Sequence, residues 1–296
     1  MAEIKGYKGL RFNCEKAGKI EELVCPPYDI ISDQQREEHI KTNPHNIIRL
    51  ELPKGDDKYN KAAEILKDWL EKGILVKEDK PAIYIYEEEF TAYGERKAIK
   101  GIICRVKLEE FSKGIILPHE FTLSKAKEDR LSLMKATNCN FSQIYSLYMD
   151  GGKNTLGKID SLSKSEPDIQ LQDNDNVTHR MWIIKDEKAI ADICSDFTDR
   201  KLYIADGHHR AASAVKVGLK RRAENPGYTG EEPFNYFLSV LFPDEELMIL
   251  PYNRVVKDLN GLSREQFFEA VKEKFELEEI GKEPYAPAEK GTFGMY

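Results

Sequence analysis

Along the whole chain, segments with the apolar pattern of β-strands occur among segments in which apolar residues recur at helical spacing. Segments 82–90 and 98–108 are rich in β-branched and aromatic residues and flank Tyr93-Gly94, so they predict a β-hairpin. Apolar residues at helical spacing over 59–70 predict an amphipathic helix that packs on a core. The pattern therefore predicts a fold in which helices and strands are mixed.

Two serines carry the pattern of a helix start. Ser32 is followed by Gln35 and Ser263 by Gln266, the spacing of a capping box in which side chains and backbone satisfy each other's donors. Pro44 predicts that the first of these helices ends at about residue 43, because the residue before a proline disfavours helical geometry. Helices are thus expected directly after residues 32 and 263.

Shorter patterns predict the remaining elements. They are strands at 47–52, 143–149, 178–185, 201–205 and 234–242, helices at 124–136, at 187–197 and after residue 207, a surface helix or loop at 151–167, and an exposed polar loop at 168–176. The last residues, GTFGMY, predict the start of a further strand. The fold class indicated is α+β, with mixed sheets and helices and without an internal repeat.

Composition narrows the class of protein. The chain has 296 residues, 41% of them apolar and 33% charged, which is typical of a globular protein with one large core or two smaller ones. A net charge of -7 argues against a nucleic-acid partner, which calls for a basic face. The sequence has no apolar run that predicts a signal peptide or a membrane span, and its five cysteines form no CxxC pair, so we expect a reduced, cytoplasmic protein.

The densest group of candidate residues lies where a short apolar strand meets a helix. Asp206, Gly207, His208, His209 and Arg210 stand in a row between the strand and an alanine-rich segment. Glycine permits the tight turn, and the first turn of a helix offers unpaired N–H groups at the positive end of its dipole. An arginine there grips phosphate oxygens in a bidentate way. The junction is therefore predicted to bind a phosphate group.

The alternative is purely structural. Asp206 is a favoured N-cap residue, and two histidines at a helix start are also compatible with a solvated terminus. A turn needs only the aspartate and the glycine, however, so the three further polar residues favour a functional role for the cluster.

A second group of candidates surrounds residue 120. His119 and Glu120 could transfer a proton, and Lys125 and Arg130 could form a cationic clamp for the ligand. Leu123 stands where a zinc-binding HExxH helix would have its second histidine, so that motif is absent. The structural alternative is a helix over 124–136 with a charged outer face.

Five further residues are candidates for the substrate site, each with a structural alternative. Tyr28 and Asp29 follow two prolines on a stiff turn, which suits a binding loop or a simple turn into the next helix. Arg49 alternates with apolar residues and could reach a ligand or face solvent. His179 and Arg180 could contact a substrate carboxylate or lie at an exposed strand end.

Five blocks in fixed order carry a family resemblance over nearly the whole chain. These blocks are CPPYDIIS (25–32), NPHNIIRLELP (43–53), PHEFTLSKAKEDR (118–130), HRMW (179–182) and IADGHHRAASA (204–214). Together they resemble the domain-of-unknown-function 1015 family. Members of that family are usually longer at the C-terminus, which implies that this chain is truncated or a short member.

The DGHHR turn of the last block is similar to the phosphate-binding turn of ParB/sulfiredoxin-like proteins, a class that includes free-serine kinases. The resemblance covers residues 206–210 and no more. It implies that the turn holds nucleotide phosphates. It also implies a ParB/sulfiredoxin-like region over 111–296, preceded over 1–110 by an α+β region that carries the hairpin.

These observations predict a nucleotide-dependent phosphoryl transferase, or kinase, acting on a small hydroxyl substrate such as free serine. The expected cofactors are ATP or ADP and Mg²⁺, with Asp206 helping to place the metal. Glu120 or Asp29 is expected to take the hydroxyl proton, and His119 and His209 are further catalytic candidates. Nothing in the sequence matches a GxxxxGK[ST] loop or a protein-kinase motif.

Two other classes of function remain open. A metal-dependent phosphatase or hydrolase could use His119, Glu120, Asp206 and either His208 or His209 as metal ligands. A regulatory module without enzymatic activity would bind a nucleotide at the same turn and leave small hydroxyl compounds unmodified.

Overall fold

The computed structural model describes all residues except 123, 153, 250–252 and 283–284, and leaves the side chains of 124–126 undescribed. Contacts divide the chain into two units, Met1–Leu247 and Met248–Tyr296. The division expected between residues 110 and 111 does not coincide with this one, because strands from both sides of residue 110 pair in one sheet.

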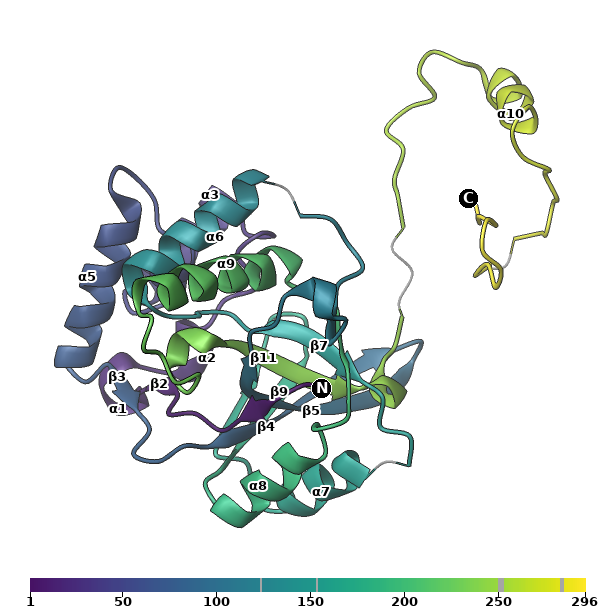
Figure 1. Ribbon diagram of the computed structural model, residues 1–296. Coiled ribbons are helices and arrows are strands. Elements are labelled where there is room, and N and C mark those ends of the chain that lie inside the picture. Colours follow the sequence, from purple (N-terminus) through teal and green to yellow (C-terminus); the bar gives the residue numbers. More distant parts are fainter. Residues whose placement is uncertain (123, 153, 250–252, 283–284) are drawn as a thin grey trace. The chain divides into compact units, whose positions relative to one another are not determined.

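The helices and strands are those labelled in Figure 1. The helices are α1 (Cys14–Ala17), α2 (Ile20–Leu23), α3 (Asp33–Thr42), α4 (Ile48–Glu51), α5 (Lys58–Glu71), α6 (Ser124–Thr137), α7 (Asn154–Leu162), α8 (Glu187–Ser195), α9 (His208–Glu224) and α10 (Arg264–Lys272), with short 3₁₀ turns at Phe111–Lys113, Pro233–Asn235 and Asp244–Glu246. The strands are β1 (Ile4–Lys5), β2 (Leu10–Phe12), β3 (Leu75–Lys77), β4 (Ile83–Ala92), β5 (Glu95–Lys107), β6 (Ile116–Leu117), β7 (Ile144–Tyr148), β8 (Ile169–Gln172), β9 (Thr178–Ile184), β10 (Leu202–Asp206) and β11 (Tyr236–Pro243).

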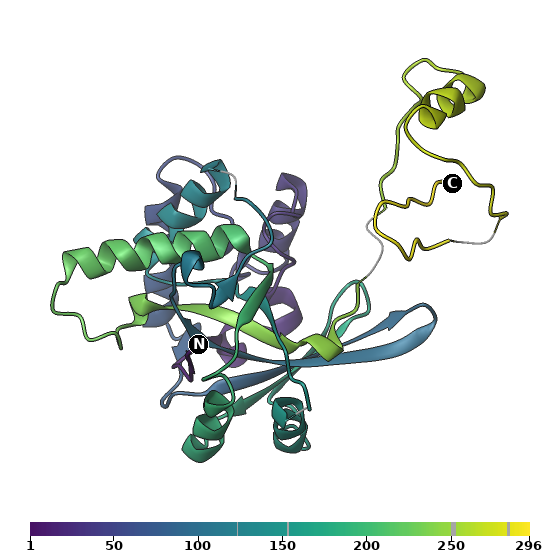
Figure 2. The same ribbon diagram turned by 45° about the vertical axis from the view of Figure 1, so that its right-hand side comes forward.

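One mixed sheet organises the larger unit. Among the described residues it has nine strands, in the order β6-β10-β7-β11-β5-β4-β9-β8, with β1 paired to β5. The pairs β6/β10 and β7/β11 are parallel and the other pairs antiparallel. Helices α6 and α9 lie on one side of the sheet with α5, and α7 and α8 lie on the other (Figures 1 and 2). This mixed arrangement of helices and sheet confirms the predicted fold class at that level.

The hairpin and the helix starts are where the sequence predicts them. Strands β4 and β5 pair from Tyr84 to Ala92, and the turn residues Tyr93 and Gly94 have φ angles of 53° and 77°. Two positive φ angles are what the tightest hairpin turns require, and glycine adopts them without strain. Ser32 forms the predicted capping box at the start of α3. The corresponding box at Ser263 begins α10 in the smaller unit.

Residues 48–51 form helix α4, so the strand predicted over 47–52 is wrong. The buried side chain of Asn46 decides the local structure. Its Oδ1 accepts the N–H of Ile48 at 2.9 Å, and its Nδ2 donates to the carbonyls of Glu22 and Val24, both at 2.8 Å. These bonds favour a helical turn over extended backbone, and an apolar run this short has no period that distinguishes the two.

Two other predictions are also wrong. Residues 169–172, expected in a loop, form the edge strand β8, because the alternation of Ile169 and Leu171 with two glutamines suits a strand with one solvated face. The turn after it is fixed by Asp173, whose Oδ1 accepts the N–H groups of Asp175 and Val177, both at 2.9 Å. The final residues, GTFGMY, form no strand in the described part of the chain.

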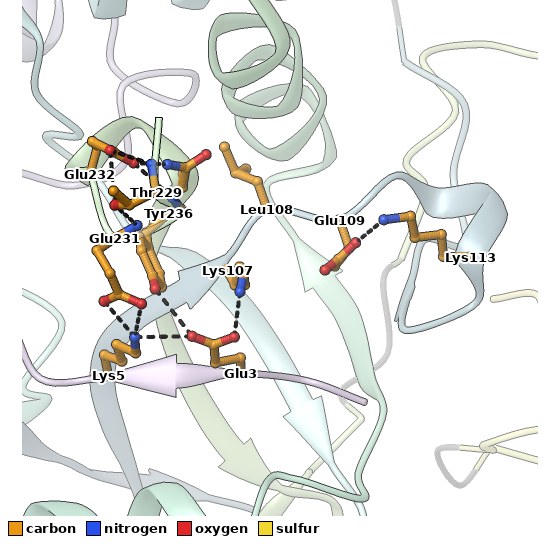
Figure 3. A network of polar contacts seen from close by, with 12 residues as sticks. Glu3, Lys5, Lys107, Leu108, Glu109, Lys113, Thr229, Glu231, Glu232 and Tyr236 are labelled. Atoms are coloured by element: carbon orange, nitrogen blue, oxygen red, sulfur yellow. Dashed lines mark hydrogen bonds and ion pairs between the residues drawn. The ribbon is translucent and has the colours of Figure 1, made fainter. Parts of the chain in front are cut away.

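The N-terminal strand is tied to the sheet by a group of charged residues (Figure 3). Ile4 of β1 pairs with Val106 of β5. Glu3 Oε2 lies 2.6 Å from the ammonium group of Lys107, and the hydroxyl of Tyr236 donates to Glu3 Oε1 at 3.1 Å. Burial opposes ionisation of Glu3, but the two neighbouring lysines prevail and lower the pKa of its carboxyl.

Two groups of buried side chains form the core. The larger joins the sheet to α8 and α9 and includes Ile83, Ile102, Phe197, Phe237 and Leu241. The smaller lies under α5 and includes Leu23, Leu50, Ala62, Leu66, Trp69 and Leu133. Full burial of one such large side chain contributes about 1.5–3 kcal/mol. Helix α6 contributes Leu133 to the smaller group and also contacts α9, so it connects the small core to the helix that follows β10.

Within the described residues, no helix is both long and apolar enough to cross a bilayer.

Candidate functional site

The junction between β10 and α9 begins with Gly207. This residue is the N-cap of α9, with φ 92° and ψ 26°, and as a glycine it has no side chain of its own with which to cap the helix. The prediction that Asp206 could be the cap is therefore wrong. Ala211 donates its N–H to the Gly207 carbonyl at 2.9 Å, which closes the first turn. The amides of His208, His209 and Arg210 precede that bond, in the positions where helical N–H groups have no partner within the helix.

Arg210 folds back over the start of its own helix. Its Nη2 donates to Asp206 Oδ2 at 2.5 Å. A Cβ atom on Gly207 would lie 2.9 Å from Arg210 Nε, so glycine is needed both for the positive φ and for the position of the guanidinium. The side chain of Arg210 is 12% exposed and that of Asp206 72%. The junction thus presents a largely covered guanidinium and an open carboxylate beside the first amides of α9.

His119 meets this junction from the neighbouring strand. It follows β6, which pairs in parallel with β10. Its Nδ1 lies 2.8 Å from the carbonyl oxygen of Ile204, and because a carbonyl only accepts, Nδ1 carries the proton. Its backbone N–H donates to His208 Nε2 at 3.2 Å, and the two rings meet edge to face with centroids 4.5 Å apart. Backbone groups therefore fix which nitrogen of each ring remains for other partners.

The carboxylate of Glu120 lies between the two remaining ring nitrogens. Its Oε1 is 3.8 Å from His119 Nε2, and its Oε2 is 3.7 Å from His208 Nδ1. An ionised carboxylate and the unprotonated Nε2 of a neutral imidazole are both acceptors, so the gap between Glu120 and His119 can take up a proton. Both side chains are more than half exposed, so a ligand can reach them.

His208 is the buried member of this group, with 3% of its side chain exposed. Burial and the neighbouring His119 lower the pKa of His208 below its usual value of 6.5. Its Nε2 is already an acceptor for the backbone, so Nδ1 holds the proton of the neutral ring and faces Glu120. His208 thus presents an N–H toward the carboxylate, 3.7 Å away, without carrying a charge.

Arg130 is buried and does not form the predicted clamp. Its Nη1 donates to the carbonyl of Glu51 at 2.9 Å and its Nε to Asp129 Oδ2 at 3.0 Å. The ring of Tyr28 covers the guanidinium, with 3.9 Å between the ring centroid and Cζ. Burial raises the pKa of the Tyr28 phenol against the opposing charges of Arg130 and Arg210, so the phenol stays neutral. Arg130 therefore holds the Tyr28 turn beside the junction.

Glu51 is a site residue that sequence reasoning missed. Its carboxyl is buried, Ser142 donates to its Oε1 at 2.8 Å, and burial raises its pKa although Arg130 opposes this. A small pocket of about 20 Å³, enough for about one water molecule, lies here. Its lining residues are Glu51, Arg130, Leu133, Met134, Cys139, Asn140, Phe141, Ser142 and Arg210. The sequence holds one indication of Glu51, an acidic residue placed between the apolar Leu50 and Leu52.

Asp129 joins α6 to α5 beneath the site. Its Oδ1 accepts from Lys58 at 2.7 Å and from the hydroxyl of Tyr59 at 2.8 Å, while Oδ2 is bound by Arg130. Burial opposes ionisation, but these partners prevail and lower the pKa of Asp129 to about 2. The side chain of Lys125, a predicted ligand of the nucleotide, lies outside the described residues.

Three predicted substrate residues are not brought to the junction. Arg49 is in α4 and donates to the carbonyl of Pro44 at 2.9 Å. His179 and Arg180 lie on β9, which four strands separate from β10, a distance of about 24 Å across a sheet. Asp29 directly follows Tyr28 in the chain, and its charge adds to burial in raising the pKa of the Tyr28 phenol.

Among the described residues there is no group of three or more His, Cys, Asp or Glu side chains arranged to hold a metal ion. Asp206 offers a single open carboxylate next to the helix start. Mg²⁺ commonly takes one or two protein carboxylates and completes its shell with water and phosphate oxygens, so these residues fit Mg²⁺ only together with a bound phosphate group.

A family model described as "Protein of unknown function (DUF1015)" matches residues 4–296. No curated protein and no solved structure matches the chain.

Proposed function

The chain belongs to the DUF1015 family, and on that premise we propose that it is a nucleotide-dependent phosphoryl transferase acting on a small hydroxyl compound. One observation carries the proposal. The open carboxylate of Glu120 lies between His119 and His208, at the same strand ends as the start of α9, whose N-cap is a glycine, and the guanidinium of Arg210. A proton acceptor and an anion-binding helix start are thus adjacent.

The start of α9 is the proposed phosphate site. Its first amides and the helix dipole favour an anion, and the helix is 17 residues long, so the dipole is fully developed. Arg210 can exchange its bond to Asp206 for a bidentate bond to phosphate oxygens, because both partners lie at the helix start. Phosphoryl transfer depends mainly on such positioning and charge neutralisation.

Glu120 is the proposed general base. As the hydroxyl oxygen of the acceptor bonds to the terminal phosphorus, the bond from phosphorus to the leaving phosphate breaks and the hydroxyl proton passes to Glu120. His119 Nε2 can share that proton once the 3.8 Å gap to Glu120 Oε1 closes, and the Nδ1–H of His208 faces the second carboxylate oxygen at 3.7 Å. Asp29, the other predicted base, directly follows Tyr28, whose ring covers Arg130, and we assign it a contact with the acceptor.

Mg²⁺ is the proposed metal cofactor, with Asp206 as its protein ligand, and ATP or ADP the proposed phosphate donor. When bound, the metal would neutralise charge on the phosphate oxygens. Release of Arg210 from Asp206 would free the carboxylate for the metal and the guanidinium for the phosphate.

The acceptor we propose is free serine or a similar hydroxy acid. The support is the similarity of residues 206–210 to the turn of ParB/sulfiredoxin-like proteins, which include free-serine kinases. The Tyr28–Asp29 turn is held next to Arg210 by Arg130 and offers a hydroxyl and a carboxylate to an amino acid.

The test is a transfer assay. The protein is incubated with Mg²⁺ and either ATP or ADP against a panel of amino acids and hydroxy acids, and new phosphate esters are followed by phosphorus NMR. We expect transfer to a hydroxyl, reduced at least 100-fold in Glu120→Gln, the range in which general bases contribute. Glu110→Gln is the matched control, because Glu110 is an exposed carboxylate in the connection that precedes β6, whereas Glu120 is in the connection that follows it.

Other outcomes of this assay identify other functions. Release of phosphate from phosphoserine without nucleotide would indicate a phosphatase. Nucleotide binding with no turnover of any acceptor would indicate a regulatory module. Either result would overturn the proposal.

A further inference from the structure

A second, larger pocket lies away from the junction, where the β4–β5 hairpin meets the turn between β8 and β9. Its volume is about 510 Å³, within the range of sites for small molecules. The lining residues are Glu88, Phe90, Thr91, Ile99, Asp175, Asn176 and Val177. The end of the hairpin, seen in blue at the right of Figure 2, extends past the last β4–β9 pair, at Glu89 and Thr178.

The carboxylate of Glu88 is held in place at the wall of this pocket. The hydroxyl of Tyr86 donates to Glu88 Oε1 at 2.8 Å, and its oxygen lies 2.7 Å from His179 Nδ1. His179 Nε2 is in turn 3.1 Å from Asp173 Oδ2. Side chains from β4, from β9 and from the turn between β8 and β9 thus orient Glu88, in the way that fixed neighbours orient the polar groups of binding sites.

The lining is negative on one side and apolar on the other. It contains two carboxylates, Glu88 and Asp175, and among its described members it contains no lysine or arginine. The nearby cation Arg180 is paired with Glu87, at 2.6 Å, and with Glu89, the two carboxylates that flank Glu88 along β4. The apolar wall is made of one aromatic and two aliphatic side chains, Phe90, Ile99 and Val177.

From this combination we infer that the pocket binds a small organic cation, a compound with an ammonium group and a compact apolar body. The ammonium group would pair with Glu88 and Asp175, and the apolar body would lie against Phe90 and Ile99. Four strand spacings, about 19 Å, separate β4 from β10, so this site is distinct from the phosphate junction and independent of the proposed function.

The test compares two probes of the same shape. Binding of 2-phenylethylamine, which is an ammonium ion at neutral pH, and of neutral 2-phenylethanol is measured by calorimetry and by NMR shifts of Ile99 and Val177. We expect the amine to bind at least tenfold more tightly than the alcohol and to move both signals. We expect Glu88→Gln to remove that difference and added salt to reduce it.

Two variants keep the test decisive. Glu95→Gln removes an exposed carboxylate at the tip of the same hairpin and should leave both affinities unchanged. Asp175→Asn provides the measurement if Glu88→Gln does not fold. Asp175 lies in an exposed turn, so its substitution should weaken amine binding without affecting the core. Equal binding of the two probes, no binding of the amine, or an equal effect of Glu88→Gln and Glu95→Gln would overturn the inference.

Discussion

His208 Nε2 accepts a hydrogen bond from the backbone N–H of His119, although 89 residues separate them in the sequence. This contact joins the end of β6 to the start of α9, and together with the bond from His119 to Ile204 it fixes the tautomer of both rings. Glu120 then lies between two imidazoles whose free nitrogens are defined. The proton chemistry of the site therefore depends on backbone groups that side-chain substitution does not remove.

The buried His208 makes the protein less stable in acid. Its pKa is lowered in the folded state, so the unfolded chain binds the proton more readily, and stability falls as the pH falls below about 6.5. His208→Gln, which keeps an acceptor near the His119 amide, should weaken this dependence. The free energy of unfolding, measured with urea at pH 7.5 and pH 5, checks the prediction. An equal loss in the wild type and the variant would contradict it.

Gly207 is required by its backbone geometry. An alanine there would adopt φ 92° at a cost of about 1–2 kcal/mol and would displace Arg210, so we expect Gly207→Ala to lower both stability and phosphate affinity. The matched control is Gly157→Ala in α7, where a Cβ meets nothing within 4 Å. Because alanine favours helices, the control should be neutral or stabilising by up to about 1 kcal/mol. Thermal unfolding of both variants measures the two changes in stability. Equal changes in Gly207→Ala and Gly157→Ala would contradict the requirement for glycine at residue 207.

Tyr28 is held by its face, not by its hydroxyl. Tyr28→Leu removes the ring that covers Arg130 and should cost about 1–2 kcal/mol, while Tyr28→Phe keeps the ring and should cost little. Urea unfolding of the two variants measures the difference. A larger loss in Tyr28→Phe than in Tyr28→Leu would show that the hydroxyl is the important contact.

Asp129 stabilises the helices beneath the site only while it is ionised. Its pKa is about 2 in the fold against 3.8 for a free carboxyl, so its contribution is complete above about pH 4 and is lost as the pH falls toward 2. Asp129→Asn should therefore lower the free energy of unfolding at pH 7 by about 1–2 kcal/mol, and the difference from wild type should shrink in acid. A pH-independent difference would contradict this assignment.

Local elements at the junction could be predicted from the sequence because neighbouring residues determine them. The apolar strand, the glycine and the alanine-rich helix are present as β10, Gly207 and α9. Residues 47–52 could not be assigned correctly, because the side chain of Asn46, which accepts the N–H of Ile48, is held by bonds to carbonyls more than 20 positions away. The same reason explains why β8 was not predicted. It forms a strand because it pairs with β9, and this pairing is not determined by its neighbouring residues alone.

The contacts of the site depend on long-range pairing and are harder to predict. His119 meets His208 only because β6 pairs in parallel with β10. The sequence does not distinguish Arg130 from Arg210, because both are cations. In the fold, Arg130 is buried under Tyr28 and has a structural role, whereas Arg210 lies at the helix start. Glu51 is brought to the site by the fold of its short helix and by Ser142.

The central claim, that the start of α9 binds phosphate, is tested most directly by titrating the protein with pyrophosphate and following its backbone amides by NMR. We predict the largest shifts at Gly207, His208, His209 and Arg210, and at least a tenfold loss of affinity in Arg210→Ala. Arg221→Ala, near the opposite end of the same helix, should bind as the wild type does. Shifts confined to other parts of the chain, or equal affinities for the two arginine variants, would contradict the account.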